Sequence, residues 1–500
     1  MKKYLLIVIL SILVILGIIW IFLYKDQTKE EKLKEENYEE ITMVLPTSGF
    51  VPENIETVTD ALNEISVSKC NVKVNFIFTN ISDMTYVCRF RLKAGEQIDL
   101  MPCMENNNLL SYIKDGMLEP LDDLLAEEAP ELEELFYPEL WEAMHINGKI
   151  YALTALGSQS NWSGAYLRED VLEAAGINAE DILADYAASE GTIVERLDQT
   201  FTPILAAIHN SENVMEDGSS LSEKKLIPGN NDYQSIFSQF PVIEYEGFGN
   251  TFGVVIDSKP EIVNIYETEE YKEKIELLKS WNEAGYIYQK KRSVDDDMNV
   301  LFHGENALGI FTSLGVDVVD SQNAVAVNEN LYLPLVNEKC AADKFRIGTW
   351  VIPSSSEHKE AAMKILKLMF TDEEYVRTYY YETNSSSESD VYDTGVRWMF
   401  GNTYLSTESY EQSKEDVTKY YSAIHYSPYL SFTYDDSKYE DIISALQEIL
   451  DSYLPDLENG KVEDVDTKLQ EMNEELYEAG LQKIIDDKQM QLDQWIQQTQ

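Results

Sequence analysis

The sequence predicts an α/β protein whose first part is a parallel β-sheet. Apolar residues make up 44% of the 500 residues and aromatic residues 11%, a composition typical of a chain with a large folded core. Residues 41–45, 72–78 and 98–102 have the patterns of strands, and residues 55–65 and 83–94 between them have the apolar spacing of helices. This alternation of strand and helix predicts parallel strands joined by right-handed crossovers.

Polar residues follow these strands at the edge where we expect a ligand. In an open parallel sheet, ligands bind beyond the carboxyl ends of the strands. The loops after the three strands contain Ser48, Glu105 and Asn106, which are therefore candidate ligand contacts. Ser and Asn also cap helices and turns, so a capping role is an equal alternative for each of them.

Further strands and helices are expected along the rest of the chain. The expected strands are 149–156, 165–167, 308–311, 331–336 and 349–352. The expected helices are 193–208, 269–284 and 357–370. From Asp436 the chain is predicted to be helical to its end, with breaks at Gly460 and Gly480.

Residues 4–24 predict an uncleaved membrane anchor. They contain no charged residue and as a helix would span about 31 Å, enough to cross a bilayer. Lys2 and Lys3 precede them, which places the start of the chain in the cytoplasm and the rest outside. A cleaved signal peptide is the alternative, but it usually has a shorter apolar core followed by small residues. Residues 25–40, with four lysines and seven acids, are expected to be a charged spacer.

The charge of the chain argues against nucleic acid as a partner. The sequence has 90 acidic and 39 basic residues, a formal net charge of -51. Such a surface repels a phosphate backbone. The charge names no ligand and is interpreted as a solubility charge on a secreted surface.

The four cysteines leave two interpretations open. Cys70, Cys88, Cys103 and Cys340 form no CxxC pair, which disfavours a zinc ribbon or a thioredoxin-like site. An extracellular location permits disulfides, and buried free thiols are the alternative.

Motifs typical of enzymes are absent from the sequence, so no cofactor, metal or catalytic residue is expected. There is no HExxH, GxSxG or GxxxxGKS motif. Carboxylate pairs of the kind a glycosidase uses are expected by chance among 90 acids. Asp295, Asp297 and Asn299 resemble the start of a calcium loop, but Val300 and Asn306 stand where glycine and glutamate are required.

Four stretches in order resemble one known family. They are 41–65 with AGEQIDLMP at 94–102, 115–132 with NGKIYAL at 147–153, SGAYLREDVLEAAG at 163–176, and 348–374. This order resembles the family-1 extracellular solute-binding proteins of ABC importers, which include sugar binders. The tail 432–495 resembles a C-terminal extension found in a subgroup of Gram-positive lipoproteins. Those proteins usually have a lipid-bearing cysteine near the start, where this chain has its apolar segment.

The resemblance implies a two-lobed periplasmic-binding-protein type II fold with a cleft that closes about a hinge. On this interpretation the chain divides into consecutive parts. They are the anchor 1–24, the spacer 25–40, lobe 1 at 41–156, lobe 2 at 157–290, a return to lobe 1 at 291–350, and the completion of lobe 2 with the C-terminal helices at 351–500.

Aromatic and acidic residues in expected loops or at strand ends are the further candidates for a sugar site, with Trp350 placed where the resemblance implies that the chain recrosses between the lobes. Sugars present C–H faces and hydroxyl groups, which aromatic rings and planar polar groups bind. Together with the three loop residues above, the candidates are Trp162, Tyr166, Tyr245, Glu246, Phe248, Glu305 and Trp350. Core packing is the alternative role for each aromatic residue.

The leading hypothesis is a binding protein and not an enzyme. It would capture a small solute outside the cell, an oligosaccharide in first place and a peptide in second, and deliver it to an ABC permease in the same membrane. One alternative is a surface glycan-active hydrolase, which would turn over its substrate. Another is a ligand-sensing or adhesion ectodomain without transport.

Overall fold

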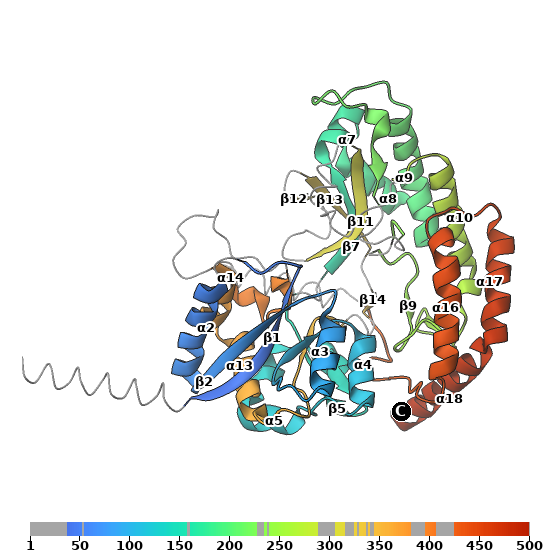
Figure 1. Ribbon diagram of the computed structural model, residues 1–500. Coiled ribbons are helices and arrows are strands. Elements are labelled where there is room, and N and C mark those ends of the chain that lie inside the picture. Colours follow the sequence, from blue (N-terminus) through green and yellow to red (C-terminus); the bar gives the residue numbers. More distant parts are fainter. Residues whose placement is uncertain are drawn as a thin grey trace, which may run out of the picture.

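The computed structural model describes residues 38–52, 55–157, 161–227, 235–237, 240–288, 306–315, 325–327, 330–336, 339–340, 345–381, 396–406 and 425–499. The expected anchor 4–24 and nearly all of the expected spacer lie outside these ranges. Within them, every helix is too short or too polar to span a bilayer. Figure 1 shows the chain folded into two lobes, with the long C-terminal helices beside the second.

The first lobe begins with the predicted parallel arrangement. Strands β1 (Glu39–Thr47) and β2 (Val72–Asn80) pair in parallel along their whole lengths. The helices α2 (Ile55–Cys70) and α3 (Met84–Lys93) follow them, and β3 (Met101–Cys103) continues beside β1 through a parallel bridge. The predicted order β-α-β-α-β is confirmed.

A later segment of the chain completes this lobe. Strand β15 (Thr349–Val351) inserts between β3 and β6 (Leu153–Thr154), antiparallel to both. Helix α13 (Lys359–Thr371) buries eight residues in the same apolar core as β1 and β2, and α14 (Glu373–Tyr381) packs against α2. The remaining elements of the lobe are α4 (Asn106–Lys114), α5 (Asp122–Glu128), η1 (Pro130–Leu135), α6 (Pro138–Met144), β4 (His145–Ile146), β5 (Lys149–Ile150), η5 (Arg397–Met399) and η6 (Thr403–Ser406).

The second lobe is built on a five-stranded sheet in the order β12-β13-β7-β11-β8. The strands are β12 (Val325–Val327), β13 (Asn330–Val336), β7 (Asn161–Arg168), β11 (Ala307–Gly315) and β8 (Lys225–Leu226). The central strand β7 is antiparallel to both of its neighbours. The predicted strands at 308–311 and 331–336 are therefore confirmed.

Helices surround this sheet and extend the lobe. Those nearest in the chain are α7 (Glu169–Ala175), α8 (Ala179–Ala188), α9 (Ile193–His209) and α10 (Glu269–Glu283). Smaller elements are η2 (Leu221–Glu223), β9 (Tyr245–Glu246), β10 (Val255–Ile256) and η3 (Ile265–Glu267). Helix α9 begins at a capping box formed by Thr192 and Glu195, which satisfies backbone donors at its start.

The C-terminal helices α16 (Glu440–Leu457), α17 (Val465–Ala479) and α18 (Leu481–Thr499) share the apolar core of the second lobe. As predicted, Gly460 and Gly480 separate them; both have positive φ angles, +63° and +116°. Figure 1 shows these helices, in orange to red, standing beside the second lobe and reaching toward α4 of the first lobe.

The division of the late segments between the lobes differs from the prediction. Residues 291–350 were expected in lobe 1, but β11 and β13 are strands of the lobe 2 sheet. Conversely, α13 and α14 were expected in lobe 2 and pack in the lobe 1 core. The reason is that an amphipathic stripe predicts burial without specifying which sheet buries it. The C-terminal helices belong to lobe 2, as expected.

Several segments cross between the lobes and form the junction. One leads from β6 to β7 and passes Leu156, which bridges to Asn402. Another leads from β13 to residue 345, and a third leads from residue 406 back to the second lobe. In the latter two, β14 (Lys339–Cys340) and β16 (His425–Tyr426) pair in parallel. The lobes are thus connected by strands that run side by side.

Candidate ligand site at the lobe junction

The first-lobe candidates lie at the sheet edge where the rule for parallel strands places them. Ser48 is exposed directly after β1, and the backbone N–H of Ile81 donates to the carbonyl of Thr47 at 2.8 Å, which joins the loops after β1 and β2. Glu105 precedes α4 and is exposed, while Asn106 begins the helix and is buried. The Glu105 side chain makes no capping hydrogen bond, so its carboxylate faces solvent at this edge.

The second-lobe candidates lie on one loop but differ in exposure. Strand β9, Tyr245 and Glu246, pairs with β10. Tyr245 is 42% exposed, whereas Glu246 is buried. The ring of Phe248 is buried against Phe432, with centroids 4.7 Å apart at 82°, and against Tyr429. Phe248 is therefore a packing residue, the alternative role that the sequence left open.

A buried lysine of the C-terminal helix α18 holds this loop. Lys488 is fully buried, and its Nζ donates to the carbonyls of Gly247 at 2.9 Å and Gly253 at 2.7 Å and to Oδ1 of Asn250 at 2.9 Å. A buried ammonium is costly unless its hydrogen bonds are made. These contacts therefore fix the shape of the loop 247–253.

The loop touches the first lobe next to Asn106. A Cβ atom added to Gly249 would lie 3.1 Å from Cδ1 of Leu110 and 4.0 Å from Oδ1 of Asn107, both on α4. The φ angle of Gly249 is +114°, a conformation that favours glycine. The structure thus brings the start of α4, with Glu105 and Asn106, and the loop that follows Tyr245 and Glu246 to one junction between the lobes.

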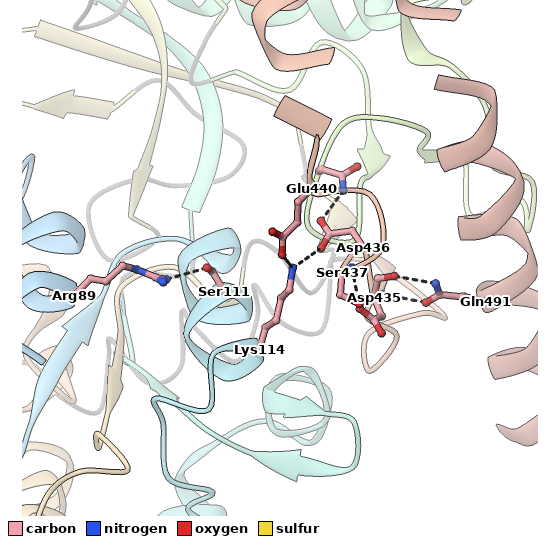
Figure 2. Close-up of polar contacts among 9 residues, drawn as sticks. Arg89, Ser111, Lys114, Asp435, Asp436, Ser437, Glu440 and Gln491 are labelled. Carbon is pink, nitrogen blue, oxygen red and sulfur yellow. Dashed lines mark hydrogen bonds and ion pairs between the residues drawn. The ribbon is translucent and has the colours of Figure 1, made fainter. Parts of the chain in front are cut away.

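Charged side chains also meet at this junction. Figure 2 shows Lys114, the last residue of α4, pointing at Asp436 and Glu440 of the second lobe. Its Nζ lies 3.8 Å from Oδ1 of Asp436 and donates to Oε1 of Glu440. The hydrogen bond to Glu440 is the largest cause that raises the pKa of Lys114 above its ordinary value. Lys114 therefore carries its charge at all physiological pH values.

The remaining predicted site residues lie elsewhere. Trp350 is fully buried in the first-lobe core, and its indole N–H donates to the carbonyl of Met399 at 2.5 Å. Trp162 was expected in a polar loop, but its backbone belongs to β7 and pairs opposite Leu314. The predicted loop at 157–164 is thus wrong from residue 161 onward, because small and polar residues there form a central strand.

Tyr166 and Glu305 complete the predicted set. Tyr166 is half-buried in β7, and its hydroxyl accepts a hydrogen bond from Nδ2 of Asn330 at 3.3 Å. It packs against the first-lobe core although its strand belongs to the second lobe, so it too lies where the lobes meet. Glu305 lies outside the described residues, as does the sequence that resembles a calcium loop.

The first lobe also has exposed aromatic residues that were not among the site candidates chosen from the sequence. Phe50, in the loop after β1, is 55% exposed, and Tyr86 and Phe90 of α3 are 75% and 60% exposed. The rings of Tyr86 and Phe90 are stacked, with centroids 6.3 Å apart. Aromatic residues four positions apart on an amphipathic helix usually indicate a buried face, so the spacing did not single them out.

The described cysteines, Cys70, Cys88 and Cys103, are free thiols that are buried or half-buried. Burial raises the pKa of Cys88 and Cys103 to about 12 and that of Cys70 to about 11, so all three remain protonated at neutral pH. Within the described ranges, no three His, Cys, Asp or Glu side chains are grouped to hold a metal ion.

Comparison with known proteins gives matches in sequence and in structure. Residues 428–497 match the family described as "Domain of unknown function (DUF3502)". The chain is 22% identical over 476 residues to a "Carbohydrate ABC transporter substrate-binding protein" of Streptococcus pneumoniae serotype 4, covering 90% of this chain and 89% of that protein.

Solved structures match nearly the whole fold. The N-glycan transport solute binding protein NgtS from Streptococcus pneumoniae matches with a TM-score of 0.72 and 19% identity, over 92% of this chain and 100% of that chain. Its complex with Man5GlcNAc matches with a TM-score of 0.68 and 18% identity, over 92% and 99%. The Streptococcus pneumoniae ABC-transporter substrate binding protein FusA, an EF-hand mutant with fructo-nystose, matches with a TM-score of 0.55 and 16% identity, over 92% and 100%. The chain therefore has the α/β fold of the solute-binding proteins, and the resemblance stated from the sequence is confirmed.

Proposed function

We propose that this chain is an extracytoplasmic solute-binding protein that takes up an oligosaccharide between its lobes and delivers it to an ABC permease. The observation that carries the proposal is the likeness, over 92% of this chain, to a solute-binding protein for N-glycan transport. The meeting of Glu105, Asn106 and the Tyr245 loop at one junction supports it, because a ligand there would contact both lobes at once.

The chemistry of the exposed residues around the junction suits a sugar. The half-exposed ring of Tyr245 offers an apolar face to C–H groups, and the carboxylate of Glu105 accepts hydrogen bonds from hydroxyls. Ser48 adds a small hydroxyl at the same edge of the first lobe, and Tyr166 lies where its strand meets that lobe. We propose these residues as ligand contacts together with Asn106 and Glu246.

The chain is proposed to be held at the outer face of the membrane by residues 4–24. Their length and lack of charge support a spanning helix, and the two preceding lysines support an outward-facing globular part. A tether keeps a captured sugar near the membrane, where a permease has to be. Membrane fractionation of cells expressing the full chain or a chain starting at residue 38 tests this: only the full chain should sediment with membranes.

Calorimetric titration of the purified full chain in detergent micelles tests the binding function. The probes are mannose–N-acetylglucosamine oligosaccharides, fructo-oligosaccharides and short peptides. We expect one oligosaccharide class to bind with a stoichiometry of one, and chromatography of the recovered ligand to return it unchanged. Binding of peptides alone would contradict the carbohydrate assignment, and shortened sugar products would instead identify a hydrolase.

A further inference from the structure

The C-terminal helical unit, residues 428–497, contacts and holds the parts of the second lobe that face the first lobe. Its helix α18 supplies Lys488, which holds the loop 247–253 beside the first lobe. The same helix holds the segment before α16: the N–H of Asp435 donates to Oε1 of Gln491 at 3.0 Å, and Nε2 of Gln491 donates to the carbonyl of Asp435 at 2.9 Å. One helix therefore fixes both second-lobe segments that face α4.

These two segments are joined to each other and then to the first lobe. Nδ2 of Asn250 donates to Oδ2 of Asp436 at 3.5 Å, while the other carboxylate oxygen of Asp436 lies 3.8 Å from Nζ of Lys114. Glu440 approaches the same ammonium. A continuous chain of polar contacts thus runs from the buried Lys488 through Asn250 and Asp436 to Lys114 on the first lobe (Figure 2 shows its outer part).

The two ends of this series of polar contacts behave differently when the lobes move. The contacts of Lys488 lie within the second lobe and are independent of the distance between the lobes. The contacts of Lys114 join residues in different lobes, 326 positions apart in the case of Glu440, and exist only while the lobes touch. Lys114 therefore interacts with Asp436 and Glu440 in one conformation and not in a more open one, which is what shifts an equilibrium between them.

We propose that the C-terminal helical unit is a clasp that closes the lobes, and that Lys114 is the positioning residue of the first lobe on which it closes. The clasp presents two carboxylates to one ammonium at the carboxyl end of α4: Asp436, in the segment that α18 holds, and Glu440, at the start of α16. That end of a helix favours a positive charge. The arrangement draws α4 and the loop 245–253 together. The effect of this closure on the affinity for an oligosaccharide rests on the function proposed above.

The size of the effect follows from the exposure of the groups. The side chains of Lys114, Asp436 and Glu440 are 34%, 35% and 67% exposed. Ion pairs this exposed change an equilibrium by about two- to fivefold. Salt screens them, because the Debye length falls to about 10 Å at 0.1 M and shortens further above it. The clasp is therefore weak enough to be opened and sensitive to ionic strength.

The experiment measures the distance between the lobes in the full chain without ligand. Spin labels attached through unnatural amino acids at Lys93 and Glu180, which are exposed on opposite lobes, report the distribution of distances by pulsed EPR. Lys114→Met should shift the populations toward longer distances by about two- to fivefold. Lys114→Glu combined with Glu440→Lys should restore much of the shorter population.

Lys69→Met is the matched control. The Lys69 side chain is 35% exposed, against 34% for Lys114, and its ammonium also pairs with two carboxylates, those of Asp372 and Glu374. These three residues all lie within the first lobe. Lys69→Met should leave the distances unchanged. A distribution for Lys114→Met equal to that of the control would overturn the clasp, as would an equal shift in both variants. This readout needs no ligand, so a failure of the sugar titration would count against the proposed function and not against the clasp.

Discussion

The guanidinium of Arg346 donates to the carbonyl of Leu430 at 3.2 Å, at the place where the chain passes between the lobes. The same group donates to the carbonyls of Ala143 at 2.7 Å and His145 at 3.1 Å. Arg346 is 1% exposed, so these bonds are made in a dry environment. The planar fork of arginine, with its five donors, is suited to joining the neighbouring carbonyls of Ala143 and His145 to that of Leu430 on a distant segment.

Replacing Arg346 should destabilise the junction. Arg346→Met would leave the buried carbonyls of Ala143 and Leu430, and the half-buried one of His145, without this donor. Each unsatisfied buried group costs about 1–3 kcal/mol. We expect the free energy of unfolding, measured by urea denaturation, to fall by about 3 kcal/mol or more. Arg346→Lys keeps the charge but not the fork, and it should recover only part of the loss. An unchanged urea midpoint in Arg346→Met would contradict this account.

Trp350 should affect stability and not affinity. Trp350→Ala removes a fully buried ring, which typically costs about 3–5 kcal/mol. Trp350→Phe keeps most of the packing and loses mainly the hydrogen bond to Met399, so we expect a loss of about 1 kcal/mol.

The decisive comparison uses Trp350→Phe, because this variant should remain folded. Its affinity for the sugar found by titration should equal that of the unaltered protein, since no part of the ring is exposed. A tenfold loss of affinity with unchanged thermal stability would return Trp350 to the ligand site.

Gly157 is a position where the crossing from the first lobe to the second tolerates no side chain. Its φ angle is +106°, and a Cβ atom there would lie 2.0 Å from Oγ1 of Thr403. Gly157→Ala should therefore lower the melting temperature, with a cost of about 1–3 kcal/mol from backbone strain plus the steric overlap.

A control for Gly157 separates the two causes. Gly116 also has a positive φ angle, +65°, but a Cβ atom there meets nothing within 4 Å. Gly116→Ala should show the backbone cost alone, so its melting temperature should fall less. Adding Thr403→Ala to Gly157→Ala should recover the steric part; no recovery would mean that the overlap with Thr403 is not the cause.

The elements of the fold were predictable because their patterns report local burial. The alternation over β2 and the apolar stripe of α13 each show which side of an element is buried. Neither shows what buries it. Helix α13 lies in the first-lobe core beside β1, more than 300 residues earlier in the chain, and no local period contains that information. This is why the elements were found and two segments were assigned to the wrong lobe.

The residues of the candidate site also fall into those that the sequence could select and those that it could not. The rule that ligands bind beyond parallel strands selected Glu105 and Asn106, which the structure places at the lobe junction. Trp350 was selected as an aromatic residue at an expected crossing between the lobes, and it is fully buried. The approach of Lys114 to Glu440 depends on how two finished lobes are arranged. Such a contact is a product of the whole fold and has no trace in either residue's own neighbourhood.

The first lobe is built from two separate parts of the chain, and this has a consequence for its folding during synthesis. The first lobe lacks its central strand β15 and helix α13 until residues 345–381 emerge, about 190 residues after its first segment ends at residue 156. At about 5–20 residues per second, those residues take about 10–40 seconds to synthesise. During this time the part of the first-lobe core that α13 covers stays open. A pause in translation before residue 345 would lengthen that interval.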